Sequence, residues 1–128
     1  MICYAVIDTK VLVSALLSSH SDAATVQLIG RLIAGEIIPV YSNEIMHEYE
    51  EVLGRKKFKF DLDMIKYILS AIKKYGILIE ASVTGIILTD MKDLPFYEVV
   101  IEMRDDNAYL VTGNLKHFPE EPFIVTAR

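Results

Sequence analysis

The alternation of short apolar runs with segments of helical periodicity most constrains how this chain can fold. The first run, Ile2 to Ile7, is continuously apolar and ends at Asp8, which is typical of a strand covered on both faces. Comparable runs occur at Ile37 to Tyr41, Ile77 to Ile79, Ala108 to Val111 and Phe123 to Val125. Strands that alternate with helices predict a three-layer α/β/α sandwich around a central, mainly parallel sheet.

The helical segments carry their own boundary signals. Apolar residues at helical spacing occupy positions 11–16 and 26–33, and Asp22 is the predicted N-cap of the second segment. Pro95 is placed for the first turn of the last helix, which follows a short apolar segment at 86–88. The predicted starts and ends of the later helices are Ser42 with Gly54, Asp61 with Gly76, and Asp93 with Met103.

The length of 128 residues corresponds to one domain, at roughly 100–200 residues per domain. We therefore expect residues 1–128 to form a single domain. The apolar runs fall far short of the roughly 20 residues that span a bilayer, and the chain begins without the basic segment of a signal peptide. The single cysteine, Cys3, cannot form an internal disulfide. These features favour a cytoplasmic location without membrane association.

The charge balance argues against a broad basic surface for nucleic acid. Lys and Arg total 13 against 18 Asp and Glu, a formal net charge of −5. Nucleic-acid binding must therefore use local clusters of basic residues. Among these residues, Lys116 is best placed for a substrate role because it lies beside Asn114 in the sequence. Each cluster alone is also typical of a solvated helix end. The clusters are Arg55, Lys56, Lys57 and Lys59; Lys73 and Lys74; and Lys116 with His117.

Several polar residues follow the predicted strands directly. In open parallel sheets, ligands bind at the carboxyl ends of the strands, which selects Asp8, Ser42 and Asn114, together with Asp93 at the start of the last helix. A carboxylate at the end of an apolar strand is costly unless a donor, water or a cation receives it. Asp8 could cap the following helix, and that role is compatible with metal binding.

The helix after Ser42 contains four glutamates, and helical geometry separates them. At about 100° per residue, Glu48 lies roughly 95° from the centre of the apolar stripe, on its flank. Glu51 and His47 point toward water, and Glu50 flanks the stripe on the other side. Glu48 is therefore the best-placed candidate, although a helix rich in glutamate is also typical of a solvated surface.

Asp90 and Asp93 form a D-x-x-D pair at a junction between a strand and a helix. Capping and loop solubility would explain the pair without any function. Alternatively, Asp93 lies over the same sheet edge as Asp8, and the clustered carboxylates would need a divalent cation to offset their repulsion. Oxygen ligands favour Mg²⁺ or Mn²⁺ over zinc. The three histidines, His20, His47 and His117, lack paired ligand spacing, which further disfavours zinc.

Four segments form an ordered pattern that spans most of the chain. They are residues 6–16 (VIDTKVLVSAL), 42–53 (SNEIMHEYEEVL), 90–96 (DMKDLPF) and 109–118 (YLVTGNLKHF). Together they resemble the motifs of the PIN-domain family, in the branch of VapC-like toxin components of toxin–antitoxin systems. The second segment carries the family's glutamate onto Glu48, the residue that helical geometry also selects.

The resemblance implies a three-layer α/β/α fold and an acidic pocket that cleaves RNA phosphodiester bonds with Mg²⁺ or Mn²⁺. It implies that Asp8, Glu48 and Asp93 hold the metal and that Asn114 is an outer ligand. Thr9 and Thr112 would hydrogen-bond the carboxylates or the phosphate. Asp90 would be an accessory residue. Since an acidic nuclease still needs positive charge to meet RNA, the basic clusters add Lys116, Arg55 and Lys56 as candidate RNA contacts. An antitoxin protein and a homodimer are the partners that the family branch implies.

Two positions depart from the family pattern and keep an alternative open. Lys10 stands where the family usually has Asn, and Asn114 stands where it commonly has Asp. Lys10 could pair with the carboxylates, contact phosphate or point into solvent. Both changes favour a catalytically weakened PIN scaffold that binds RNA or a protein partner.

A second alternative is a haloacid-dehalogenase-like phosphatase, which also begins with a strand and an Asp. The order Asp8, Thr9, Lys10 and then Ser42 resembles its motif order. Lys10 replaces the second acid of that motif, however, and the chain is short for that fold. A receiver domain would need paired acids after the first strand, and the sequence lacks them.

Overall fold

The computed structural model describes residues 3–18 and 22–127. Within them, five parallel strands form one sheet in the order β3-β2-β1-β4-β5. Strand β1 (Cys3–Ile7) is central and pairs with β2 (Ile37–Tyr41) and β4 (Tyr109–Val111). Strands β3 (Ile77–Leu78) and β5 (Ile124–Val125) lie at the two edges. The predicted parallel sheet is confirmed.

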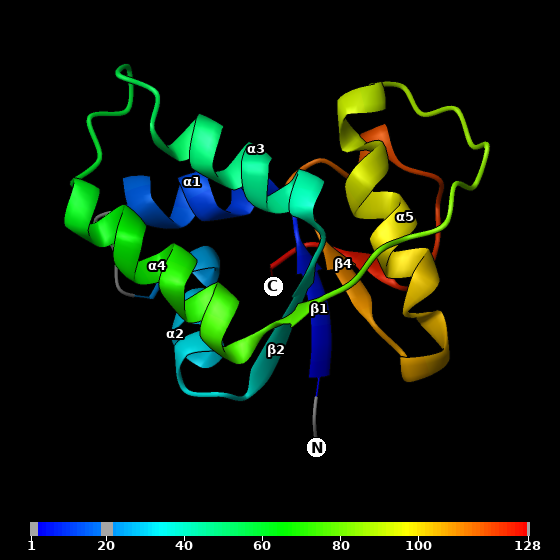
Figure 1. Cartoon of the computed structure of the whole chain (residues 1–128), viewed down its shortest axis with the longest axis horizontal. Helices are drawn as coiled ribbons and strands as arrows, with labels where there is room; N and C mark the ends of the chain where they lie inside the picture. Colours follow the sequence, from blue (N-terminus) through cyan, green and yellow to red (C-terminus); the bar gives the residue numbers. More distant parts are fainter. Residues whose placement is uncertain (1–2, 19–21, 128) are drawn as a thin grey trace.

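Helices cover both sides of this sheet. Figure 1 shows α1 to α4 gathered on one side of the strands and α5 on the other. The structure therefore has the three layers of the predicted α/β/α sandwich. The helices are α1 (Thr9–Leu17), α2 (Ala24–Ile33), α3 (Asn43–Leu53), α4 (Leu62–Tyr75) and α5 (Leu94–Glu102), and the short 3-10 turns are η1 (Met91–Asp93), η2 (Arg104–Asp106) and η3 (Leu115–His117).

The core lies on both faces of the central strand. Ala5, Val6 and Ile7 are all buried, which explains why β1 reads as a continuous apolar run. At the carboxyl end of β1, Tyr49 of α3 contacts Phe96 of α5, with ring centroids 6.3 Å apart. The Tyr49 hydroxyl donates to the backbone carbonyl of Ile7 at 2.5 Å. These contacts fix both helices against the carboxyl end of β1.

Most of the predicted helix boundaries are confirmed. The Ser42 hydroxyl accepts from the Ile45 amide at 3.2 Å, and Asp61 accepts from the Asp63 amide at 2.8 Å. Helix α4 ends at Gly76, where a Cβ would lie 2.6 Å from the carbonyl oxygen of Pro39. Only glycine permits that close approach between the helix end and β2.

Two expectations about local structure are wrong. The N-cap of α2 is Ala23 and not Asp22, which lies one residue before it. Alanine has no side-chain oxygen, so this helix start has no side-chain capping bond. The apolar segment 86–88 belongs to a loop rather than to a regular element. That loop is fastened to α5, since the amides of Ser82 and Thr84 donate to Glu102 and Glu98. No helix in the described ranges is both long and apolar enough to span a membrane.

Candidate functional site

The carboxyl end of β1 opens into a pocket of about 320 Å³ that holds the predicted acidic residues. Its lining includes Asp8, Glu48, Asp90 and Asp93. Asp8 follows β1, Glu48 lies on α3, and Asp93 lies at the start of α5. Residues that are 85 positions apart in the sequence therefore meet at one edge of the sheet, as the rule for parallel sheets predicts.

Asp8 is buried and accepts two hydrogen bonds from the protein. Its Oδ2 accepts from the Thr112 hydroxyl at 2.7 Å, and its Oδ1 accepts from the Lys10 amide at 3.4 Å. The second bond makes Asp8 the N-cap of α1. The first bond ties the end of β1 to the residue that follows β4. The capping role and a place in the pocket therefore coexist, as the sequence allowed.

Glu48 lies at the edge of the apolar face of α3, as helical geometry predicts, and is half-buried, whereas His47 and Glu51 are exposed. Its Oε2 accepts a hydrogen bond from the Thr9 hydroxyl. Burial raises the pKa of the Glu48 carboxyl above its ordinary value of 4.5. The Thr9 bond opposes this rise, and the negative charges of Asp8 and Asp93 add to it.

Asp93 occupies the N-cap position of α5 but makes no capping bond with its side chain, which corrects the sequence prediction. Asp90 instead caps the preceding η1 turn by accepting from the Lys92 amide at 3.0 Å. The Asp93 carboxylate is thereby left to contact His117, whose Nδ1 lies 3.0 Å from Oδ2. Burial and the charge of Asp8 raise the pKa of Asp93, while His117 lowers it.

His117 is the residue that sequence reasoning missed. Its Nε2 lies 3.0 Å from Nδ2 of Asn114, so the imidazole contacts both Asn114 and Asp93. The three-residue spacing between Asn114 and His117 could have revealed it, because a single 3-10 turn brings residues at i and i+3 together. The sequence pattern places His117 in a basic cluster with Lys116 and excludes it as one of a pair of zinc ligands, but it does not predict a contact with Asp93. The backbone amide of Asn114 also donates a hydrogen bond to the Thr112 hydroxyl oxygen at 3.1 Å.

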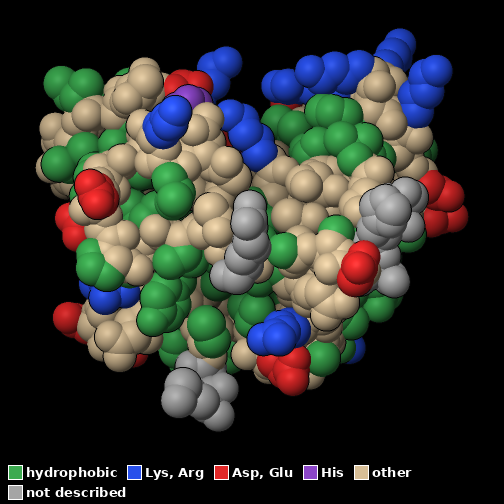
Figure 2. Space-filling model, turned by 180° about the vertical axis from the view of Figure 1, so that it is seen from behind, with side chains coloured by type: hydrophobic (Ala, Val, Ile, Leu, Met, Phe, Trp, Pro, Cys, Tyr) green, Lys and Arg blue, Asp and Glu red, His purple; other side chains and the backbone are tan. Residues whose placement is uncertain are grey.

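Four cations surround the acidic pocket: Lys10, Arg55, Lys57 and Lys92. Figure 2 shows Lys and Arg side chains gathered along one edge of the molecule, on both sides of a notch. Lys10 is exposed and, in the described part of the chain, forms no ion pair, so it does not neutralise the carboxylates directly.

Of the three predicted RNA contacts, Arg55 lines the acidic pocket, whereas Lys56 and Lys116 do not. Arg55 also forms an exposed salt bridge with Glu51, in which Nη2 of Arg55 lies 2.9 Å from Oε2 of Glu51. Lys56 is exposed on the same turn but is not part of the pocket lining. Lys116 borders a separate hollow together with Glu120 and Glu121. Among the basic residues, Lys116 is therefore not the nearest to the carboxylates.

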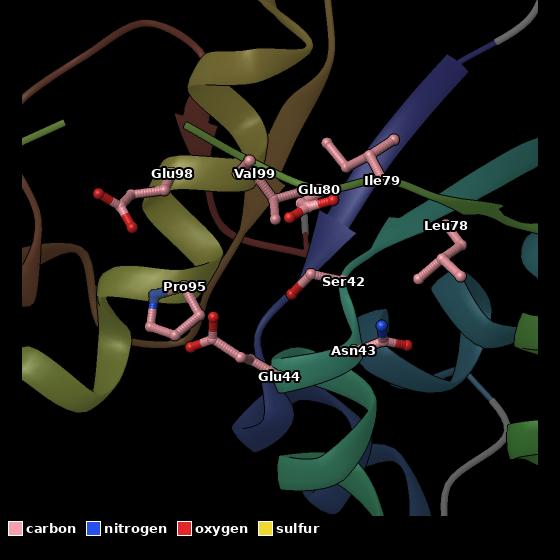
Figure 3. Close-up of a pocket in the computed structure, with 10 residues that line it drawn as sticks. Ser42, Asn43, Glu44, Leu78, Ile79, Glu80, Pro95, Glu98 and Val99 are labelled. Carbon is pink, nitrogen blue, oxygen red and sulfur yellow. The ribbon is translucent and has the colours of Figure 1, made fainter. Parts of the chain in front are cut away.

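A larger hollow, of about 530 Å³, lies between the start of α3, the end of β3 and α5. Figure 3 shows Ser42, Glu44 and Pro95 on one side of it and Glu80 and Val99 on another. Glu98 at its rim accepts from both the amide and the hydroxyl of Thr84, so it serves to hold the loop at 79–90. Of the predicted site residues, only Ser42 lines this hollow, and its hydroxyl caps α3.

The donor set of the acidic pocket fits a hard divalent cation. Three carboxylates supply oxygen ligands, and a cation would offset the burial and the mutual repulsion that together raise the pKa values of Glu48 and Asp93. Among residues 3–18 and 22–127 as they are arranged here, however, no group of three or more His, Cys, Asp or Glu side chains is placed so that it could hold a metal ion. Each carboxylate is held by a different donor: Asp8 by Thr112, Glu48 by Thr9, and Asp93 by His117.

The fold and the pocket define an α/β domain with a carboxylate site at the carboxyl ends of its central strands. A comparison with family models matches residues 4–116 to the PIN domain. The chain therefore belongs to the PIN-domain family, whose members are typically nucleases. This assignment displaces the phosphatase alternative. Neither the comparison with curated proteins nor that with solved structures found a match.

Proposed function

We propose that this protein is a Mg²⁺- or Mn²⁺-dependent endoribonuclease that hydrolyses RNA phosphodiester bonds. The observation that carries the proposal is the meeting of Asp8, Glu48 and Asp93 in one pocket with cations at its rim. Carboxylates alone would repel a polyanion, and lysines alone would bind it without cleaving it. Their combination fits the cleavage of a phosphodiester that is drawn in by local positive charge.

Asp8, Glu48 and Asp93 would hold the metal, with Asn114 as an outer ligand. When bound, the ion would activate water and neutralise charge on the phosphate. Thr112 and Thr9 orient the carboxylates of Asp8 and Glu48 through their hydroxyl groups. Such outer partners fix a ligand's rotamer and thereby its affinity for the ion.

His117 is a positioning residue in this scheme, because it contacts Asp93 and Asn114 through its two ring nitrogens. Lys10, Arg55, Lys57 and Lys92 surround the pocket and supply positive charge for the phosphate backbone. Asp90 acts indirectly: by capping η1 it sets the position of Asp93.

We further propose that residues 1–128 form a single cytoplasmic domain that acts as the toxin of a toxin–antitoxin pair and forms a homodimer. An apolar hollow of about 360 Å³ between α1, α2 and α4 supports a protein partner. Met64 and Tyr67 at its rim are 49% and 56% exposed, so the hollow is bordered by exposed apolar side chains, which are typical of interaction sites when they are contiguous. The antitoxin would cover this apolar surface.

The experiment that tests the activity is a calorimetric titration of Mn²⁺ and Mg²⁺ into the protein and into its Asp8→Asn and Asp93→Asn variants. We expect saturable binding to the parent protein and its loss in both variants. RNA cleavage should require the same ions and the same two residues. If the folded parent protein binds neither ion, the alternative of a weakened PIN scaffold that binds RNA or a protein partner replaces the proposal.

A further inference from the structure

The turn between α3 and α4 contains aromatic residues that the proposed function does not use. Residues 55–60 read RKKFKF, in which basic and aromatic side chains are interleaved. The proposed function uses Arg55 and Lys57 of this turn as contacts for phosphate, but it gives no role to the two phenylalanines. An exposed basic turn gains nothing in solubility from aromatic residues, so their placement calls for an explanation.

The turn is locally ordered. The Phe58 amide donates to the Arg55 carbonyl and the Lys59 amide to the Lys56 carbonyl, both at 3.2 Å. Lys59 has a φ of 53°, in the left-handed region that side chains other than glycine rarely adopt. Backbone in that region persists only where the surrounding structure imposes it, and such positions concentrate at functional sites.

The two aromatic rings form a stack whose outer member borders the acidic pocket. The Phe58 and Phe60 centroids lie 5.2 Å apart and their planes differ by 8°. Phe60 packs against the core, whereas Phe58 is half-buried and is part of the pocket lining with Asp8, Glu48 and Asp93. The core therefore supports Phe60, and Phe60 in turn supports Phe58.

Lys57 lies over the same ring, with its ammonium nitrogen 5.1 Å from the Phe58 centroid. A contact of this kind at an exposed site is weaker than the stacking of a nucleic-acid base on an aromatic ring. A base could therefore take the place of the ammonium group, which would then be free to meet a backbone phosphate.

We propose that Phe58 forms a base-stacking subsite for an unpaired nucleotide next to the cleavage pocket, with Arg55 and Lys57 contacting the flanking phosphates. This inference rests on the proposed function, since it places the stacked base beside the scissile bond. Bases within a duplex are already stacked and cannot reach a side chain on the surface, whereas single-stranded segments present their faces. The subsite therefore selects single-stranded RNA.

The chain contains no tryptophan, which allows a direct optical test. Phe58→Trp introduces a single tryptophan, whose fluorescence should be quenched when a single-stranded oligoribonucleotide is added in EDTA. Tyr75→Trp is the matched control, because Tyr75 is also partly exposed, also lies under a lysine (Lys74, 5.4 Å), and is at the opposite end of α4. We expect no quenching in the control, nor from duplex RNA of the same sequence added to Phe58→Trp.

A second measurement separates stacking from general binding. Phe58→Leu keeps an apolar side chain against Phe60 but lacks a π face, and it should weaken binding of the single strand about tenfold by fluorescence anisotropy. Phe58→Trp should bind at least as well as the parent protein, and Tyr75→Leu should leave affinity unchanged. Equal affinity of Phe58→Leu and the parent protein, or equal quenching by duplex RNA, would overturn the proposal.

Both measurements are made without metal, so they do not depend on cleavage. Stacking at Phe58 without any cleavage on addition of Mn²⁺ would support the subsite and contradict the proposed nuclease. Cleavage that depends on Asp8 but proceeds equally well in Phe58→Leu would support the nuclease and contradict the subsite.

Discussion

Nδ1 of His117 lies 3.0 Å from Oδ2 of Asp93, and the other ring nitrogen lies 3.0 Å from the Asn114 side chain. The imidazole therefore joins Asp93, at the start of α5 and in the pocket lining, to the turn after β4. Two substitutions separate these contacts, because an asparagine amide can replace Nδ1 and a glutamine amide can replace Nε2.

We expect His117→Gln to lower Mn²⁺ affinity about tenfold, since it loses the contact with Asp93, and His117→Asn to retain most of the affinity. Calorimetric titration measures both values, and thermal unfolding in EDTA checks that the two variants are equally folded. An affinity of the asparagine variant at or below that of the glutamine variant would contradict the positioning role.

Thr112 is fully buried, and its hydroxyl is the closest donor to the buried carboxylate of Asp8. Thr112→Val removes that donor while keeping the shape of the side chain. We expect the free energy of unfolding to fall by about 1–3 kcal/mol, because one oxygen of Asp8 is left without its partner. Urea unfolding measures the change. Thr112→Ser keeps the hydroxyl and should lose clearly less; equal losses in the two variants would assign the effect to packing.

The raised pKa of Glu48 predicts how stability depends on pH in the absence of metal. The folded protein holds this proton more tightly than the unfolded chain, so unfolding releases a proton at pH values between the ordinary and the raised pKa. Stability therefore falls as pH rises through this window and stays lower above it. Glu48→Gln has no proton to lose and its amide oxygen still accepts from Thr9.

We expect Glu48→Gln in EDTA to melt a few degrees higher than the parent protein at pH 7, and the difference to vanish below pH of about 4. Scanning calorimetry across this range provides the measurement. Saturating Mn²⁺ should reverse the order at pH 7, since only the parent protein retains the full set of carboxylates. A parent protein that melts higher than the variant in EDTA at pH 7 would contradict the electrostatic interpretation.

Lys10 and Asn114 are the two positions that depart from the family pattern, and the structure predicts that they contribute unequally. Lys10 is exposed, whereas Asn114 contacts His117 and Thr112 beside the pocket. We expect Lys10→Asn with Asn114→Asp to strengthen Mn²⁺ binding and RNA cleavage, with most of the gain from Asn114→Asp. Titration and cleavage assays on the single and double variants test this. If neither Mn²⁺ affinity nor RNA cleavage increases, Lys10 and Asn114 are not what would weaken catalysis in this chain.

Much of the fold could be predicted from the sequence because it depends on local signals. The continuous run before Asp8 indicated a doubly covered strand, and Ser42, Asp61 and Gly76 marked helix ends through capping and backbone constraints that act over a few residues. The angular position of Glu48 followed from helical geometry alone. Asp22 failed as a cap because capping depends on the backbone angles of one residue, which a pattern locates only to within a residue or so.

The assembly of the site was decided by tertiary structure. Parallel pairing of β1 with β4 brings Thr112 to Asp8 across 104 positions, and the packing of α3 against α1 brings Thr9 to Glu48. The sequence pattern predicts Asp93 as an N-cap, but its side chain contacts His117, and Asp90 caps the preceding turn instead. Local sequence determines which elements form and which faces are apolar. Which side chains share a hydrogen bond depends on how those elements pack, since the partners are distant in sequence and no local pattern encodes their separation.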